Sequence, residues 1–196
     1  MTAGPRRRES LAERRERKTA IDDPSVVLEA AARFLEARSR SVAEVRRRLT
    51  GAGYRADLVE GAIERMTELG MLDDDAFARA WVESRDRARP RGERAIREEL
   101  RLKGVERDVI EAVLTDRREG VREGIAEADD APLSPDRMAA ERLLARHVHA
   151  LARVADPRQR RQRAYALLAR NGFDPETCRE VAAGVDRGPD EAEPPD

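Results

Sequence analysis

The feature that most constrains the fold is a frame of residues that occurs three times in the chain. Each copy has a leucine, a glycine four residues later, an apolar residue next, and an acid three residues further on. The copies begin at Leu49, Leu100 and Leu168, and the third keeps the later part of the frame more loosely. Glycine just past a helix adopts the left-handed conformation that closes a helix C-terminus. An acid near the start of the next helix faces the positive end of its dipole. The frame therefore predicts three helix–turn–helix pairs.

Apolar residues recur at helical spacing ahead of each pair, which predicts a longer helix before it. These residues are Val27, Leu28, Ala31, Phe34 and Leu35, then Phe77, Ala80, Trp81 and Val82, then Leu143, Leu144 and Val148. The unit is three helices, and the fold class is all-α with three tandem three-helix repeats. We place the repeats at 24–66, 67–115 and 137–185. The residues that we expect to be structural are Phe34, Leu49, Gly53, Phe77, Trp81, Leu100, Gly104, Leu168 and Gly172.

The charge of the segments outside the repeats, together with their proline and glycine content, predicts that they are tails and a linker. Residues 1–23 read as a disordered basic N-terminal tail, and 186–196 read as a disordered acidic tail. Residues 116–136 hold seven acids and three basic residues, with two glycines and two prolines. We expect them to form an acidic linker.

Composition excludes several classes of protein. The chain is 40% charged and 3% aromatic, with 39 basic and 40 acidic residues. This near-balance excludes a polybasic protein, and the few aromatics argue against a β-sandwich or barrel. No apolar run is long enough to span a membrane, and a single cysteine excludes a disulfide framework. We expect a cytoplasmic protein without a membrane partner, and a monomer.

The chain lacks a recognisable catalytic or cofactor-binding set. His147 and His149 are the only histidines, and on a helix they face different sides. Cys178 occupies an apolar position, where a buried thiol is expected. The run Asp73 to Asp75 suits a helix start better than a metal site, because consecutive helical residues point in different directions. We expect no enzyme activity, no metal and no cofactor.

The remaining signal is basic residues that recur beside the repeated glycine frame. Of the 39 basic residues all but two are arginines, which codon usage explains as well as function does. A solvated charged face is the simpler interpretation, since acids are interleaved. The functional one is a strip that contacts DNA phosphates or an acidic protein surface. The candidate binding residues are Arg38, Arg40, Arg46, Arg47, Arg85, Arg91, Arg94, Arg97, Lys103, Arg160, Arg161 and Arg163.

Three stretches resemble the RecX family of recombination regulators. The first is Arg38-x-Arg40-Ser41-x-x-Glu44-Val45, continuing to Leu49 and Gly53. The second runs from Leu72 to Arg85, and the third from Pro90 to Val105. The resemblance covers residues 27–115, whereas 137–185 match only in helical frame.

The resemblance implies an elongated, curved array of three repeats that binds the RecA filament on DNA. It implies inhibition of RecA ATPase, filament growth and strand exchange, in DNA recombination, DNA repair and the SOS response. The positions that match the family are Arg38, Arg40, Phe77, Trp81, Arg85, Lys103 and Gly104, of which we expect Phe77, Trp81 and Gly104 to be structural. The alternative is a DNA-binding helical module that does not depend on RecA, because three-helix units with a basic helix are similar to helix-turn-helix readers. Weak direct DNA binding is compatible with either.

Overall fold

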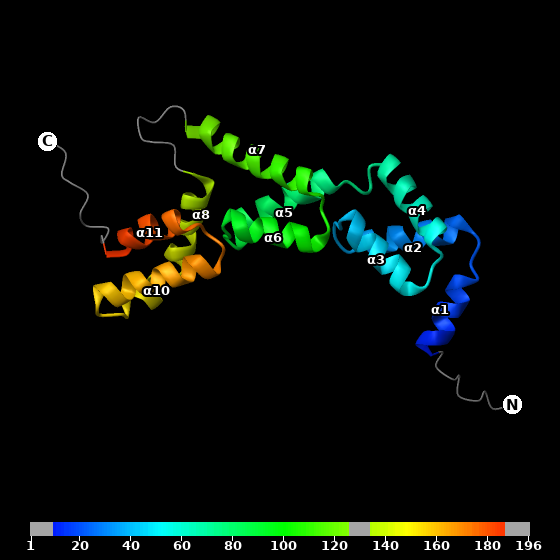
Figure 1. The fold of residues 1–196 in the computed structure, drawn as a ribbon, viewed down its shortest axis with the longest axis horizontal. Coiled ribbons are helices and arrows are strands. Elements are labelled where there is room, and N and C mark those ends of the chain that lie inside the picture. The colour runs from blue at the N-terminus through cyan, green and yellow to red at the C-terminus, as the bar shows by residue number, and fades with distance from the viewer. Residues whose placement is uncertain (1–9, 126–133, 187–196) are drawn as a thin grey trace. The chain divides into compact units, whose positions relative to one another are not determined.

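The computed structural model describes residues 10–125 and 134–186, and throughout these residues every regular element is a helix. The first group is α1 (Leu11–Thr19), α2 (Pro24–Glu36), α3 (Val42–Ala52) and α4 (Ala56–Glu68). The second is α5 (Asp74–Ala88), α6 (Glu93–Lys103) and α7 (Arg107–Ile125). The third is α8 (Pro135–Arg146), α9 (Val148–Ala152), α10 (Pro157–Arg170) and α11 (Pro175–Ala183), followed by the 3₁₀ turn η1 (Gly184–Asp186) (Figure 1). The all-α prediction is confirmed.

The three frame glycines do what their sequence position predicts. Gly53, Gly104 and Gly172 have φ angles of 102°, 82° and 82°, in the left-handed region. They follow α3, α6 and α10, respectively, and each turns the chain into the next helix. The acid of each frame lies in the first turn of that helix. The glycine frame therefore marks the turn between the two helices of each pair, as predicted.

The chain divides into two compact units. The first comprises residues 1–77 together with 103–105, and its core lies between α2, α3 and α4. Val27, Val45, Leu49 and Val59 are almost completely buried there. Ser41 begins α3 with a capping box, in which its side chain accepts from the Glu44 amide and the Glu44 carboxylate accepts from the Ser41 amide.

The second unit comprises residues 78–102 and 106–196. A core cluster joins α8, α9, α10 and α11, and Leu168, Phe173 and Cys178 are buried in it. Ile96 and Leu100 of α6 are fully buried as well. Asp156 and Asp174 begin α10 and α11, each by accepting hydrogen bonds from backbone amides of the first turn.

Within the first unit, the start of α3 is held by residues that follow in later helices. The Asp74 carboxylate accepts a hydrogen bond from the Val42 amide at 2.9 Å, and the Ser41 hydroxyl donates to the Lys103 carbonyl at 2.6 Å. A Cβ placed on Gly104 would lie 2.4 Å from the Ala43 Cβ, so only glycine fits. This set of contacts forms a joint around the N-terminus of α3.

The second unit repeats this joint one repeat later, around the N-terminus of α6. Asp136 accepts from the Glu93 amide at 2.9 Å, and the Gly92 amide donates to the Asn171 carbonyl at 3.0 Å. A Cβ on Gly172 would lie 2.4 Å from the Ala95 Cβ. An aspartate that accepts from a first-turn amide, a donor to the carbonyl before the glycine, and an alanine against the glycine thus recur in successive repeats. The donor is the Ser41 hydroxyl in one joint and the Gly92 amide in the other, and Ala95 lies one position further along its helix than Ala43.

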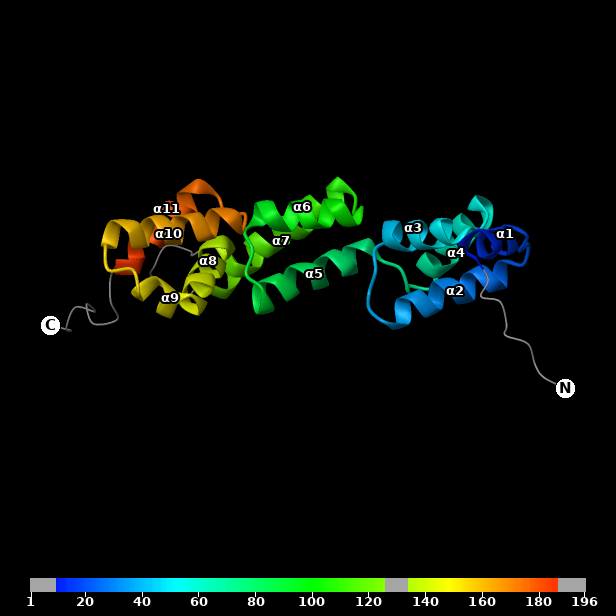
Figure 2. The ribbon, with the colours of Figure 1, turned by 90° about the horizontal axis from the view of Figure 1, so that it is seen from below.

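The predicted disordered tail 1–23 is wrong for residues 11–19, which form α1. Ser10 and Glu13 make a capping box, which stabilises the first turn. The helix lies beside α3 (Figures 1 and 2). The Thr19 hydroxyl donates to the Gly53 carbonyl at 2.9 Å, and the Lys18 ammonium lies 4.6 Å from the centre of the Tyr54 ring. No residue of α1 is buried, so polar contacts hold it.

The predicted linker 116–136 is also too long. Residues 116–125 continue α7, because Arg117 anchors that part of the helix by ion pairs to Asp86 and Asp136. Pro135 and Asp136 already belong to α8. The remaining part, 126–133, lies outside the described residues, as do 1–9 and 187–196, where the predicted tails fall.

The third group has a break that the apolar spacing does not predict. The helix expected to run through Val148 ends at Arg146, and α9 starts a new turn. The His147 Nδ1 lies 2.9 Å from the Leu143 carbonyl, while its backbone amide donates to the Leu144 carbonyl instead. The imidazole takes the acceptor that a continuing α-helix needs, and the helix stops.

Candidate functional site

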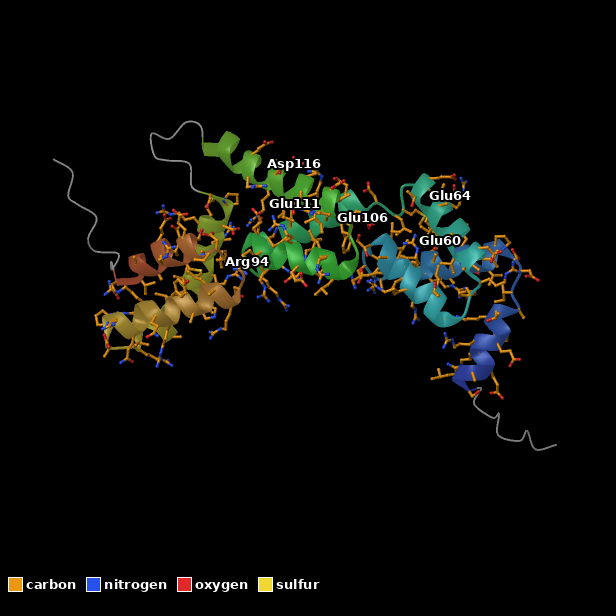
Figure 3. The ribbon with its side chains drawn as sticks, in the orientation of Figure 1. Glu60, Glu64, Arg94, Glu106, Glu111 and Asp116 are labelled. Atoms are coloured by element: carbon orange, nitrogen blue, oxygen red, sulfur yellow. The ribbon has the colours of Figure 1, made fainter. Side chains whose placement is uncertain are left out.

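Charge is divided between the second and third helices of the repeats. The second helices α3, α6 and α10 carry most of the candidate basic residues. The third helices α4 and α7 carry a series of acids (Figure 3): Glu60 and Glu64 lie along α4, and Glu111 and Asp116 lie along α7, whereas Arg94 lies at the start of α6. Most of the basic residues that recur beside the glycine frame therefore lie on one helix of each repeat, whereas Arg38, Arg40, Arg85 and Arg91 lie outside these helices.

Most candidate basic residues form ion pairs within the chain. Arg38 and Lys103 both contact Glu44, at 3.1 and 3.3 Å, and Arg46 makes two hydrogen bonds to Glu60. Arg160 and Arg161 contact Asp186 at 3.0 and 3.1 Å. The candidates that have an acidic partner in this way are Arg38, Arg46, Arg85, Arg91, Arg97, Lys103, Arg160 and Arg161.

Glu99 is the centre of a half-buried cluster in the second repeat. Its carboxylate accepts a hydrogen bond from Trp81 Nε1 at 2.9 Å and one from Arg85 Nε at 2.5 Å. The Arg85 guanidinium also stacks 4.1 Å from the centre of the Trp81 ring, and Arg91 Nε lies 3.6 Å from the second Glu99 oxygen. One carboxylate thus contacts two arginines and an indole, and Arg91 also donates to Asn171 Oδ1 at 2.8 Å.

Arg97 is held equally firmly by acids of two helices. It makes two hydrogen bonds to Glu111, at 2.7 and 3.1 Å, and one to Glu93 at 2.8 Å. The hydrogen bonds that Arg97 donates to Glu111 and to Glu93, with the charges of both acids, raise the pKa of Arg97 above its ordinary value despite partial burial. Substituting Arg97 by glutamate would put a third carboxylate beside Glu93 and Glu111. Such a variant would lose stability, so a loss of partner binding would not show that Arg97 contacts the partner.

A smaller group of candidates has no acidic partner among residues 10–125 and 134–186. Arg47 donates to the Lys103 carbonyl at 3.3 Å, and Arg40 stacks on Phe34. Arg94 and Arg163 are exposed on α6 and α10. The four candidates of this group are Arg40, Arg47, Arg94 and Arg163, and they have the guanidinium groups that are best placed for a partner.

The residues expected to be structural lie in or against the cores. Leu49, Phe77, Leu100 and Leu168 are buried, and Phe34 packs against the core of the first unit. Trp81 is half-buried and bonded to Glu99, a partnership that helical spacing alone does not reveal.

The residues considered for chemistry have structural surroundings as well. Asp73 accepts from the amides of Asp75 and Ala76, as expected for a helix start. Cys178 is buried, and this burial raises the pKa of its thiol above the ordinary value. Across the described ranges, no group of three or more histidine, cysteine or carboxylate side chains has the arrangement of a metal site.

Arg117 and Asp136, which the sequence patterns did not single out, form a buried ionic group at the second joint. The Arg117 side chain is 5% exposed and contacts Asp86 at 2.8 Å and Asp136 at 2.7 Å. Burial raises the pKa of Asp136, although hydrogen bonds from the Glu93 amide and Arg117 oppose this. Both residues fall in the stretch that composition assigned to a linker, so the charge pattern concealed them.

Comparison with known proteins decides the family. Residues 28–66 match the model of the first RecX three-helix domain, and residues 73–114 match that of the second. The chain is 32% identical over 148 residues to the regulatory protein RecX of Mycolicibacterium vanbaalenii, which covers 72% of each chain. The chain belongs to the RecX family. A RecX protein of Mycobacterium avium is 34% identical over 149 residues, with 76% of this chain and 78% of the relative covered.

RecX structures share the fold. The crystal structure of RecX from Lactobacillus salivarius superposes with a TM-score of 0.68 over 85% of this chain and 99% of that one, at 17% identity. A second regulatory protein RecX gives a TM-score of 0.64 over 82% of this chain and 71% of the other, at 18% identity. The first family-model match falls on α2–α4, and the second falls on α5, α6 and the first part of α7. Within the described ranges, no helix has the length and apolar character that crossing a bilayer requires.

Proposed function

We propose that this chain is a regulator that binds the RecA filament on DNA and inhibits its ATPase, filament growth and strand exchange. The observation that carries the proposal is membership of the RecX family, through two matched three-helix domains and relatives aligned over more than 70% of their length. The protein would act by binding, in the cytoplasm and as a monomer, without catalysis of its own. DNA recombination, DNA repair and the SOS response are the processes that such a regulator would affect.

The layout of charge supports binding through the second helices of the repeats. Arg47 and Arg94 lie on α3 and α6, and Arg163 lies on α10. They are exposed, and no described acid forms an ion pair with them. Guanidinium groups of this kind bind carboxylates and phosphates through two parallel hydrogen bonds. The filament presents both groups, on RecA and on its DNA.

RecA ATPase on single-stranded DNA tests the proposal. The wild-type protein should inhibit ATP hydrolysis at amounts close to stoichiometric with the filament, and absence of inhibition would overturn the function. The double change Arg94→Glu and Arg163→Glu should weaken inhibition by about tenfold or more. The matched control is Arg142→Glu with Arg179→Glu, which alters net charge equally at exposed arginines of α8 and α11. Equal inhibition by both double variants would exclude Arg94 and Arg163 as contacts.

Titration with duplex DNA in the absence of RecA tests the alternative, a DNA-binding helical module. Sequence-selective binding that persists at moderate salt would favour that module. Weak binding that falls steeply with salt and does not depend on sequence is the expected result for a filament regulator with basic helices.

A further inference from the structure

Repeat 1 and repeat 2 place different charges at equivalent positions. When Gly53 is aligned with Gly104, Phe34 corresponds to Arg85, Arg40 to Arg91, and Arg48 to Glu99. In repeat 2 the carboxylate of Glu99 accepts a hydrogen bond from Arg85 and forms an ion pair with Arg91 at 3.6 Å. Repeat 1 has an arginine, Arg48, at the position of that carboxylate.

The repeat 1 residues form a cationic cluster around one aromatic ring. The Arg40 guanidinium carbon lies 4.3 Å from the centre of the Phe34 ring, and that of Arg48 lies 5.7 Å from it. Neither arginine forms an ion pair with any residue that the structure describes. The nearby acid Glu44 is engaged by Arg38, Lys103 and the Ser41 amide. We call Phe34, Arg40 and Arg48 the Phe34 cluster.

Arg40 has an unsatisfied donor at this cluster. Its Nε is buried and has no hydrogen-bond partner. A buried N–H without an acceptor is unfavourable, and two guanidinium groups beside one ring repel each other. An anion that contacts both Arg40 and Arg48 would neutralise this repulsion. Phe34 would give that anion a partly apolar wall, which strengthens the ion pair by excluding water.

We propose that the Phe34 cluster is a binding site for a carboxylate on an acidic segment of a partner protein. Repeat 2 indicates which anion suits the site, because the carboxylate of Glu99 occupies the equivalent position there. A glutamate or aspartate of the partner would take the equivalent position in repeat 1, bonded to Arg40 and Arg48. The inference that this partner is RecA rests on the proposed function. The existence of the carboxylate site is tested without RecA.

The site is tested by NMR of the arginine Nε–Hε groups of the full chain, with a glutamate octapeptide as the probe. The signals of Arg40 and Arg48 should shift and saturate as the peptide is added. The signal of Arg33, an exposed arginine that pairs with Glu29 on α2, should stay unchanged and serves as the internal control. If the Arg40 and Arg48 signals do not respond, or respond no more than Arg33, the site is overturned. A larger response to inorganic phosphate or to an eight-nucleotide thymidine oligomer at equal concentration would overturn the assignment to a carboxylate.

Two variants separate the site from general electrostatics. Arg48→Glu gives repeat 1 the residue of repeat 2, so its own carboxylate should occupy Arg40 and abolish peptide binding. Arg48→Gln removes one charge at an exposed position and should weaken binding by about tenfold. Arg142→Glu matches the charge change of the first variant on α8 and should bind as the wild type does. If the wild type and Arg48→Gln bind the peptide with equal affinity, the proposal is contradicted. This comparison remains valid even if Arg48→Glu does not fold.

Co-sedimentation with RecA filaments then distinguishes the two proposals. If the wild type sediments with the filament and Arg48→Gln does so to a much smaller extent, the carboxylate site is part of the RecA contact. If both sediment equally, the inference fails as a RecA contact while the proposed function stands. If the wild type does not sediment, the proposed function fails, and the peptide titration alone decides the site.

Discussion

Asp136 accepts a hydrogen bond from the backbone amide of Glu93 at 2.9 Å, and so holds the start of α6 from the first turn of α8. Asp74 does the same for Val42 at the start of α3. Each aspartate satisfies an amide that its helix cannot satisfy itself. The second helix of a repeat is therefore capped by an aspartate from a later helix. The glycine of the next frame packs against the first turn of the same capped helix.

Gly172→Ala should destabilise the protein by about 3 kcal/mol, since a side chain costs 1–2 kcal/mol in the left-handed conformation and overpacking adds to that. The new Cβ would lie 2.4 Å from the Ala95 Cβ and 2.6 Å from the Ala95 amide nitrogen. Urea denaturation measures the difference.

The control for that change is Gly61→Ala, in the interior of α4, where a Cβ meets nothing within 4 Å. It should stabilise the protein by up to about 1 kcal/mol through helix propensity. Equal effects of the two substitutions would contradict the role assigned to the Gly172 joint.

Glu99→Gln should destabilise the protein by about 2 kcal/mol, because charge-assisted hydrogen bonds are the stronger class. The change removes the negative charge that Arg85 and Arg91 share. Glu98→Gln is the matched control on the same helix. The Glu98 side chain is 53% exposed and, among the described residues, pairs only with Arg101, so its loss should cost much less than the loss of Glu99. Midpoints of chemical denaturation that shift equally for both variants would refute the central position of Glu99.

The local repeat could be predicted from sequence because its causes are local. A glycine with positive φ, an acid in the next turn and an apolar stripe are all read within a dozen residues, and Gly53, Gly104 and Gly172 all behave accordingly. The capping box of Ser10 and Glu13 is equally local, but the high charge of residues 1–23 hid it. The family resemblance rests on the same short motifs.

What could not be predicted depends on contacts between distant residues. Arg117 joins Asp86 to Asp136 across 50 residues of sequence, and a charge run gives no sign of such burial. Most candidate arginines likewise form ion pairs with acids outside their own helix, and their local sequence does not reveal these pairs. The difference between Glu99 and Arg48 acquires meaning only when the two repeats are compared in three dimensions.

Glu44→Gln should lower stability at neutral pH by about 2 kcal/mol and lose this effect in acid. Burial raises the pKa of Glu44, but hydrogen bonds from Arg38 and the Ser41 amide, with the charge of Lys103, outweigh it and lower the pKa below the ordinary 4.5. Because the folded pKa is depressed, the stabilisation is fully present above pH 4.5 and disappears as pH falls through the lower folded value. Unfolding free energies of wild type and variant should therefore converge below pH 4.5. A difference that stays constant down to pH 3 would contradict this account.

Cys178 should resist thiol reagents in the folded protein. Its side chain is completely buried, and burial together with the charge of Asp174 raises the pKa of the thiol, so the reactive thiolate is scarce. Modification by iodoacetamide should follow the urea unfolding curve of the third repeat. Rapid reaction in the absence of denaturant would show that the α10–α11 core opens readily.

Co-sedimentation with RecA filaments formed on single-stranded DNA tests the central claim most directly. The wild-type chain should pellet with the filament in an amount that saturates with RecA, and it should remain in the supernatant with the same DNA alone at moderate salt. Recovery of the chain in the supernatant at every RecA concentration would contradict the account.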